Sequence, residues 1–142
     1  MKTSIFTTIA TTFLLISTFS SFAAEKANPL KNMNSKGIIA VYLDAAALGN
    51  TQYNEHLFAK DFEYYNTVND TKHNKKDYTK FLKENKGLQY DCKTTYQILD
   101  ESGNSCIAKA TMEFADFTRV DHITLCQTKD GWQVSKVVTT YS

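Results

Sequence analysis

The chain has 142 residues, of which 16 are basic and 15 acidic, and its formal charge at neutral pH is +1. The lysines are spread along the sequence, which argues against nucleic acid as a partner because phosphate binding needs clustered cations. The same spread offers no polybasic patch for a membrane surface. No spacing of cysteine and histidine is typical of zinc, so we expect neither a metal nor a cofactor.

Residues 1–23 have the pattern of a secretory signal peptide. Lys2 precedes an uncharged, largely apolar stretch, and Ser21 and Ala23 supply the small side chains found before a signal cleavage site. We predict cleavage after Ala23, or less favourably after Ala24, and export to the periplasm or the extracellular medium. An uncleaved membrane anchor is the alternative, but the many serine and threonine residues make a poor span. After cleavage we expect no contact with the membrane.

Residues 24–34 are polar and hold the only proline of the chain, which predicts a tether. The remaining residues, 35–142, have the length of a single domain with one sizeable core.

Three helices are expected in the first half of this domain. From Ser35, which can cap a helix, apolar residues recur at steps of three and four as far as Gly49, so one face is meant for burial. A shorter helix is expected over 51–58 and a third over 74–87. Between them, residues 61–65 have the composition of a strand.

The second half has the two-residue period of β-strands. Apolar and polar side chains alternate most clearly over 106–114, and a turn at 101–104 precedes this strand. Further strands are expected over 120–127 and 132–141, joined by an Asp-Gly pair that is a strong hairpin signal.

The last strand changes the face on which its apolar side chains lie. Trp132 and Val134 share one parity, whereas Val137 and Thr139 share the other, which predicts a β-bulge near 135–136. A bulge bends a sheet. We therefore predict a cone-shaped α+β fold, with the N-terminal helices packed on the concave face of a strongly bent antiparallel sheet.

The three cysteines, Cys92, Cys106 and Cys126, are an odd number, so at least one stays unpaired within a monomer. In the predicted strand pairing no two of them lie opposite each other. The favoured interpretation is that they are small buried hydrophobic residues, and their redox state is left open.

Several segments resemble the nuclear-transport-factor-2-like superfamily, which includes ketosteroid isomerases, scytalone dehydratase and SnoaL-like polyketide cyclases. The telling segments are 42–49, 57–62, 109–114, 120–125 and 130–134. The ending is most similar to small exported members called putative lumazine-binding proteins. The resemblance covers 35–141 and implies the cone-shaped fold. It implies no single function, because the superfamily hosts enzymes, ligand binders and interaction modules.

One acidic residue has the parity of an interior position. Asp121 shares its strand face with Ile123 and Leu125, so its carboxyl group is expected to point into apolar surroundings, where a neutral carboxyl can donate a hydrogen bond. The resemblance places Asp121 and Tyr42 at the Asp and Tyr of the isomerase oxyanion hole. The general base of the isomerase corresponds to Asn66, which cannot take a proton.

Each of these residues also has a purely structural interpretation. Asp121 would then lie at the mouth of the cone, solvated or paired with Arg119, and Tyr42 would be a core aromatic with its hydroxyl at the rim. His122 has the opposite parity and is expected to face outward. Further side chains would either line a ligand pocket or fill the core: Phe62, Tyr64, Tyr65, Tyr78, Phe81, Met112, Phe114 and Trp132.

Three hypotheses follow, and whether the protein is an enzyme is left open. The first is a non-catalytic exported domain that holds a small, largely apolar or aromatic ligand, with Tyr42 and Asp121 as polar anchors. The second is an isomerase, dehydratase or cyclase in which these two residues polarise a carbonyl, and Asp61, Glu63 or a water held by Asn66 moves the proton. The third is an interaction module that forms a homodimer through the outer sheet face and binds no ligand.

Overall fold

The computed structural model describes residues 27–142, so the predicted signal peptide and its cleavage site lie outside the described residues. The helices are α1 (Ser35–Leu48), α2 (Asn54–Leu57) and α3 (Lys75–Glu84). The strands are β1 (Phe58–Asn66), β2 (Thr71–Asn74), β3 (Lys93–Ser102), β4 (Ser105–Glu113), β5 (Thr118–Thr128) and β6 (Gly131–Tyr141). Among these residues no helix is long and apolar enough to cross a membrane.

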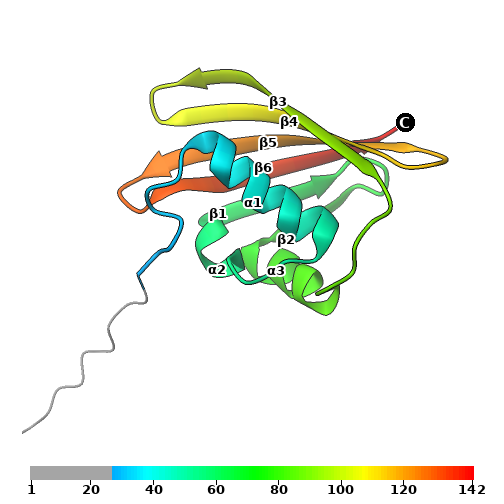
Figure 1. Ribbon diagram of the computed structural model, residues 1–142, viewed down its shortest axis with the longest axis horizontal. Coiled ribbons are helices and arrows are strands. Elements are labelled where there is room, and N and C mark those ends of the chain that lie inside the picture. Colours follow the sequence, from blue (N-terminus) through cyan, green and yellow to red (C-terminus); the bar gives the residue numbers. More distant parts are fainter. Residues whose placement is uncertain (1–26) are drawn as a thin grey trace, which may run out of the picture.

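All six strands form one curved sheet in the order β2-β1-β6-β5-β4-β3, and the helices lie on its concave side (Figure 1). This arrangement confirms the predicted α+β cone. The long strands at the centre pair antiparallel, as expected for short hairpin connections. The first strand β1, however, pairs parallel with the last strand β6. The two are far apart in the sequence, and an alternating pattern does not reveal which strands become neighbours.

The predicted bulge in the last strand is confirmed. Thr124 lies opposite Lys136 and Leu125 lies opposite Val134, so Ser135 is the extra residue on β6. The extra residue changes which side chains of β6 point into the core. Val134 and Val137 are three residues apart, yet both are fully buried.

Helix α1 begins and ends with clear caps. The side chain of Asn34, rather than Ser35, accepts a hydrogen bond from the backbone N–H of Gly37, so the predicted cap was wrong by one residue. Gly49 ends the helix in the left-handed conformation, as predicted. Helix α3 starts near Asn74, as predicted, with the Asn74 side chain as its cap, but it ends at Glu84 rather than at Gly87. The helix expected over 51–58 is shorter, because the buried strand β1 already starts within it.

Part of the predicted tether packs against the domain. Leu30 is only 1% exposed and belongs to the hydrophobic core. The amide nitrogen of Asn28 donates to the backbone carbonyl of Asp130 in the β5–β6 turn, at 2.7 Å. The described residues before α1 therefore contact the turn of the β5–β6 hairpin, and Asp121 lies near the opposite end of this hairpin.

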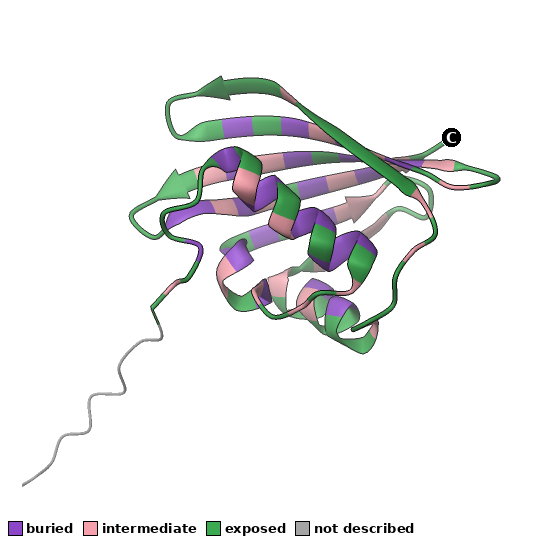
Figure 2. Ribbon diagram, viewed as in Figure 1, coloured by how far each residue is buried: buried purple, intermediate pink, exposed green. Residues whose placement is uncertain are grey.

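The core lies between the concave side of the sheet and the helices (Figure 2). Cys106 is buried in it, and Cys92 and Cys126 are half-buried. All three cysteines are free. Cys126 lies opposite Ser105 rather than opposite another cysteine, which agrees with the predicted pairing.

Candidate functional site

A buried polar cluster lies on the concave face of the sheet, and Asp121 is its centre. This residue is fully buried. Its Oδ2 accepts hydrogen bonds from the Tyr42 hydroxyl at 2.7 Å and from Arg119 Nη2 at 2.9 Å. Its Oδ1 accepts from Arg119 Nε at 2.9 Å and from the Thr139 hydroxyl at 2.7 Å. Both carboxylate oxygens are thereby engaged twice. With Tyr78, which lies next to Tyr42, these residues are called the Asp121 cluster below.

The elements bring this cluster together for simple geometric reasons. Arg119 and Asp121 are two residues apart on β5, so their side chains leave the same face of the sheet. Thr139 lies directly opposite Asp121 on β6. Tyr42 reaches the pair from the buried face of α1, and Tyr78 from the buried face of α3.

Arg119 and Asp121 form a two-point ion pair with parallel hydrogen bonds, the strongest geometry available to these side chains. Burial by itself would lower the pKa of Arg119, but the neighbouring Asp121 charge more than offsets this and the pKa lies well above its usual value. The guanidinium is therefore cationic, and Asp121 is its counter-ion. Pairing with Arg119 is what the structural interpretation anticipated, but the pair is buried rather than solvated.

The two tyrosines of the cluster are held in the phenol form. Burial, followed by the charge of Asp121, raises the pKa of Tyr42 well above its usual value. Burial likewise raises the pKa of Tyr78. The two hydroxyl oxygens are 3.4 Å apart, and since Tyr42 donates to Asp121, Tyr78 is left to donate to Tyr42. The Tyr78 ring also stacks on Tyr64, with centroids 4.6 Å apart.

These raised pKa values predict alkaline destabilisation. In the unfolded chain a tyrosine ionises near pH 10. The folded chain keeps Tyr42 and Tyr78 protonated at higher pH, so between the two pKa values the folded state binds more protons than the unfolded state. Their contribution to stability is complete below about pH 10 and is lost as the pH rises above it. We expect the free energy of unfolding to fall with pH in this range, and Tyr42→Phe to flatten the fall. Urea unfolding at several alkaline pH values measures both slopes, and equal slopes would contradict the assignment.

The other predicted site residues lie in different places. Phe62, Tyr64 and Met112 are buried in the interior, near the Asp121 cluster. Trp132 is buried too, but at the far end of β6. Phe81 is 48% exposed on α3.

Two predicted site residues lie at the same end of the sheet as the cluster. Asn66 lies at the end of β1, opposite Thr139, and its Oδ1 accepts from the backbone N–H of Val68 at 3.0 Å. Phe114 is half-buried and follows β4, where its ring packs on that of Phe117 with centroids 4.4 Å apart. The structure brings neither of them into a hydrogen bond with Asp121. That any of the predicted site residues binds a ligand stays a prediction.

Sequence reasoning placed Tyr78 only among the aromatic residues that line a pocket or fill the core, and it did not single out Thr139. Thr139 had a usable signal, because counting residues outward from the Asp-Gly turn and through the bulge places it opposite Asp121. For Tyr78, the helical spacing predicts burial, but it carries no signal for the contact with Tyr42.

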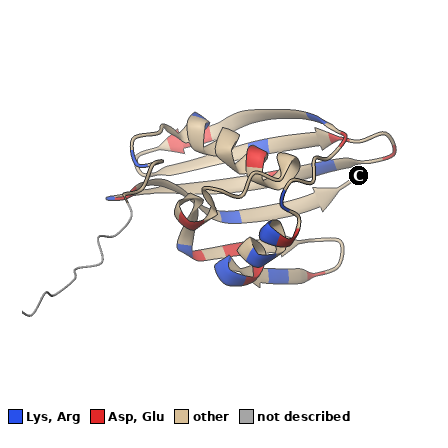
Figure 3. Ribbon diagram, turned by 60° about the horizontal axis from the view of Figure 1, so that its bottom comes forward, with Lys and Arg blue, Asp and Glu red and all other residues tan. Residues whose placement is uncertain are grey.

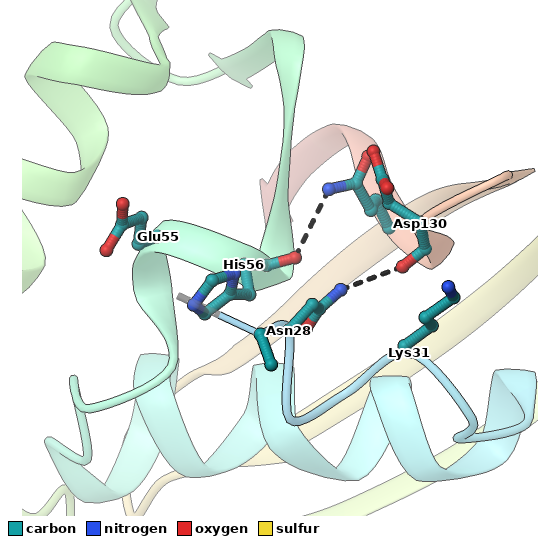
Figure 4. A pocket seen from close by; sticks show the side chains of 7 residues that line it. Asn28, Lys31, Glu55, His56 and Asp130 are labelled. Carbon is teal, nitrogen blue, oxygen red and sulfur yellow. Dashed lines mark hydrogen bonds between the residues drawn. The ribbon is translucent and has the colours of Figure 1, made fainter. Parts of the chain in front are cut away.

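Five surface pockets among residues 27–142 lie away from this cluster, and neither Tyr42 nor Asp121 lines any of the five. The largest, of about 710 Å³, lies between the tether, α2 and the β5–β6 turn (Figure 4). There the Asn28 side chain spans to Asp130, and Gln133 donates to the His56 carbonyl at 3.3 Å. No group of three His, Cys, Asp or Glu residues in this part of the chain is arranged to hold a metal ion.

Solved structures with the same fold are numerous, and they share little sequence with this chain. A protein of unknown function from Silicibacter pomeroyi, described as NTF-2 like, is 11% identical, with a TM-score of 0.62 over 75% of this chain and 92% of that one. An NTF2-like protein from Methylobacillus flagellatus is 20% identical, with a TM-score of 0.61 over 75% and 88%. A CaMKII hub from S. rosetta is 15% identical, with a TM-score of 0.59 over 75% and 93%. At these identities the likeness concerns the fold alone.

A comparison with curated proteins finds no significant match. A protein family described as "Putative lumazine-binding" matches residues 34–142, which is the whole of α1 to β6. The chain therefore belongs to the family described as "Putative lumazine-binding", and it has the fold of NTF2-like proteins.

Proposed function

We propose that this domain is exported and holds a small, flat, largely aromatic ligand without transforming it. The observation that carries the non-catalytic part is the state of Asp121. Its two oxygens accept four hydrogen bonds and its charge is paired with Arg119. A carboxylate in this state has no proton to donate to a substrate carbonyl and no free lone pair to act as a base.

The residues that would replace the missing base support the same proposal. Asn66 cannot take a proton, and its side-chain oxygen is already used by the backbone of Val68. Asp61 and Glu63 are exposed and leave β1 on the side opposite to the buried Phe62 and Tyr64. None of these groups is placed to move a proton within the cone.

Arg119 is the member of the Asp121 cluster that a ligand could contact. Its side chain is 11% exposed, whereas that of Asp121 is completely buried. A guanidinium has five N–H donors, and Asp121 takes two of them, through Nε and Nη2. The remaining donors suit a carbonyl or carboxylate oxygen of a ligand.

Aromatic rings surround this end of the sheet. Four of them form a chain of contacts that we call the aromatic rim: Tyr90, Phe114, Phe117 and Tyr141. Tyr141 lies opposite Arg119 on β6, and the exposed Phe117 precedes Arg119 by two residues. Exposed rings beside a planar cation are suited to a flat ring system, which stacks on the rim and accepts from Arg119. Lumazine, after which the family is named, is a flat bicyclic ring with carbonyl oxygens.

Titration with lumazine, followed through its own fluorescence, tests the proposal. We expect saturable binding, and about a fivefold loss of affinity in Phe117→Ala and in Tyr141→Ala, since each removes one stacking ring. The matched controls are Leu99→Ala and Tyr96→Ala, because both side chains are similarly exposed but lie on β3. The controls should change affinity by less than about twofold. No binding, or equal losses in all four variants, would reject the rim as the site.

Mass spectrometry of the protein from its own host tests the remaining parts. Under native conditions a co-purifying small aromatic compound is expected. Under denaturing conditions the mass should lack residues 1–23, and a full-length mass would contradict export by signal cleavage. Light scattering at high concentration tests the third hypothesis, the homodimer: a monomer would count against it.

A further inference from the structure

Three lysines of α3 and Lys86, two residues after its end, lie along one groove, although the lysines are spread along the sequence. They line a groove of about 470 Å³ between α3 and the turn that leads into α2. The basic positions on α3 are blue on the ribbon in Figure 3. The groove is lined by Thr51, Asn54, Lys76, Thr79, Lys80, Lys83 and Lys86. Its walls contain four positive charges and no acidic side chain.

The geometry of the helix explains this separation of charges. With about 3.6 residues per turn, Lys76, Lys80 and Lys83 lie within about 60° of one another around the axis. The acidic residues of α3 are Asp77 and Glu84. Around the helix axis they lie past Lys80, on the side away from Lys83, and they do not line the groove.

The four lysines have no acidic partner. Across residues 27–142 the ion pairs are Arg119 with Asp121 and Lys136 with Glu63. The fold therefore places four exposed lysines along one groove without an acidic partner, which makes the local potential positive and favours an anion there.

A second, independent feature of the same groove is an unsatisfied amide. Asn54, the first residue of α2, is 8% exposed, and its Oδ1 is buried and has no hydrogen-bond partner. Leaving a buried acceptor unpaired is unfavourable. Because Asn54 lines the groove, a turn of its side chain would let a hydroxyl group on a bound molecule supply the missing donor.

We propose that this groove binds a small polyol that carries two or more phosphate groups. The lysines would hold the phosphates as flexible point charges, and Asn54 would accept from a hydroxyl. This site lies on α3, away from the aromatic rim, so it does not depend on the function proposed above.

Isothermal titration at low salt with two probes, pyrophosphate and fructose bisphosphate, tests the site. We expect both to bind the intact protein, with affinity falling as salt is added. Lys80→Gln combined with Lys83→Gln should weaken both by about tenfold or more. Lys93→Gln combined with Lys129→Gln removes the same charge from exposed positions outside the groove and should have less than about a twofold effect. Absence of binding, or equal losses in the two double variants, would overturn the proposal.

Asn54→Ala separates the hydroxyl contact from the charges. It should weaken fructose bisphosphate but not pyrophosphate, while the unfolding midpoint stays the same or rises because an unsatisfied acceptor has been removed. Equal weakening of both probes would refute the role of Asn54.

Two kinds of molecule could supply these phosphate groups, a soluble phosphate ester and a lipid head group. Sedimentation with phosphatidylcholine vesicles, with and without cardiolipin, whose head group joins two phosphates through a glycerol, distinguishes them. Binding to the anionic vesicles that pyrophosphate displaces would identify a lipid head group. Binding of the soluble probes alone would identify a soluble ester.

Discussion

Replacing Asp121 by asparagine is expected to lower the free energy of unfolding by about 3–5 kcal/mol, the usual cost of removing one partner of a buried ion pair. Asparagine has nearly the same shape, so the loss is electrostatic rather than a cavity effect. The variant leaves the Arg119 charge without a counter-ion. The asparagine amide also has one oxygen that accepts hydrogen bonds, while its NH₂ group faces N–H or O–H donors that it cannot accept from. Urea unfolding followed by circular dichroism measures the change through the midpoint at constant slope.

A double variant shows whether the charge pair or the space it occupies matters. Arg119→Met combined with Asp121→Leu removes both charges and keeps the interior filled, and such replacements of buried ion pairs are often neutral. We expect this double variant to be more stable than Asp121→Asn alone. A loss below about 1 kcal/mol in Asp121→Asn would mean that the pair contributes little and that water reaches Arg119 readily.

The double variant Arg119→Met/Asp121→Leu also tests the proposed function. If the Asp121 cluster exists to position Arg119 for a ligand at the aromatic rim, a purely apolar replacement should keep the fold and lose the ligand. If the cluster is only structural, lumazine affinity should not change in the double variant. The stable double variant is therefore more informative for binding than the destabilised single one.

The sequence predicted the fold well because its signals are local. The helical spacing before Gly49, the Asp-Gly hairpin and the parity change before Val137 each depend on a few neighbouring residues, and each is found where expected. The parallel pairing of β1 with β6 was not predictable in this way. It depends on contacts between residues about 70 positions apart, for which a single sequence carries no pattern.

The candidate site was only partly predictable for the same reason. Strand parity was enough to place Asp121 inside the cone. Parity could not show whether the space around it is open, or whether its oxygens are free, because that depends on how α1 and α3 approach the sheet. The closeness of Tyr78 to Tyr42, and the gathering of lysines around Asn54, both arise from the docking of α3.

Replacing Gly49 by alanine is expected to cost about 3 kcal/mol, because two effects combine at this position. Gly49 ends α1 with a φ of +70°, a conformation that a residue with a side chain adopts only at a cost of about 1 kcal/mol. A Cβ there would also lie 2.5 Å from the backbone nitrogen of Gly87 and 2.7 Å from that of Leu88. Gly87 N–H donates to the Gly49 carbonyl at 3.0 Å, so the clash would push apart the segments that follow α1 and α3.

Gly103→Ala is the matched control for the second effect. Gly103 has a φ of +56° in the β3–β4 turn, but a Cβ there meets no atom within 4 Å. It should therefore carry the conformational cost alone, about 1 kcal/mol. The difference between the two variants measures how firmly α3 is fixed against the end of α1. Because α3 supplies Tyr78 to the Asp121 cluster, Gly49→Ala should also shift the alkaline loss of stability to lower pH. Gly103→Ala should leave the pH of this loss unchanged. Equal stability of the two variants would show that the chain after α3 shifts freely, and the position of Tyr78 would then not depend on this contact.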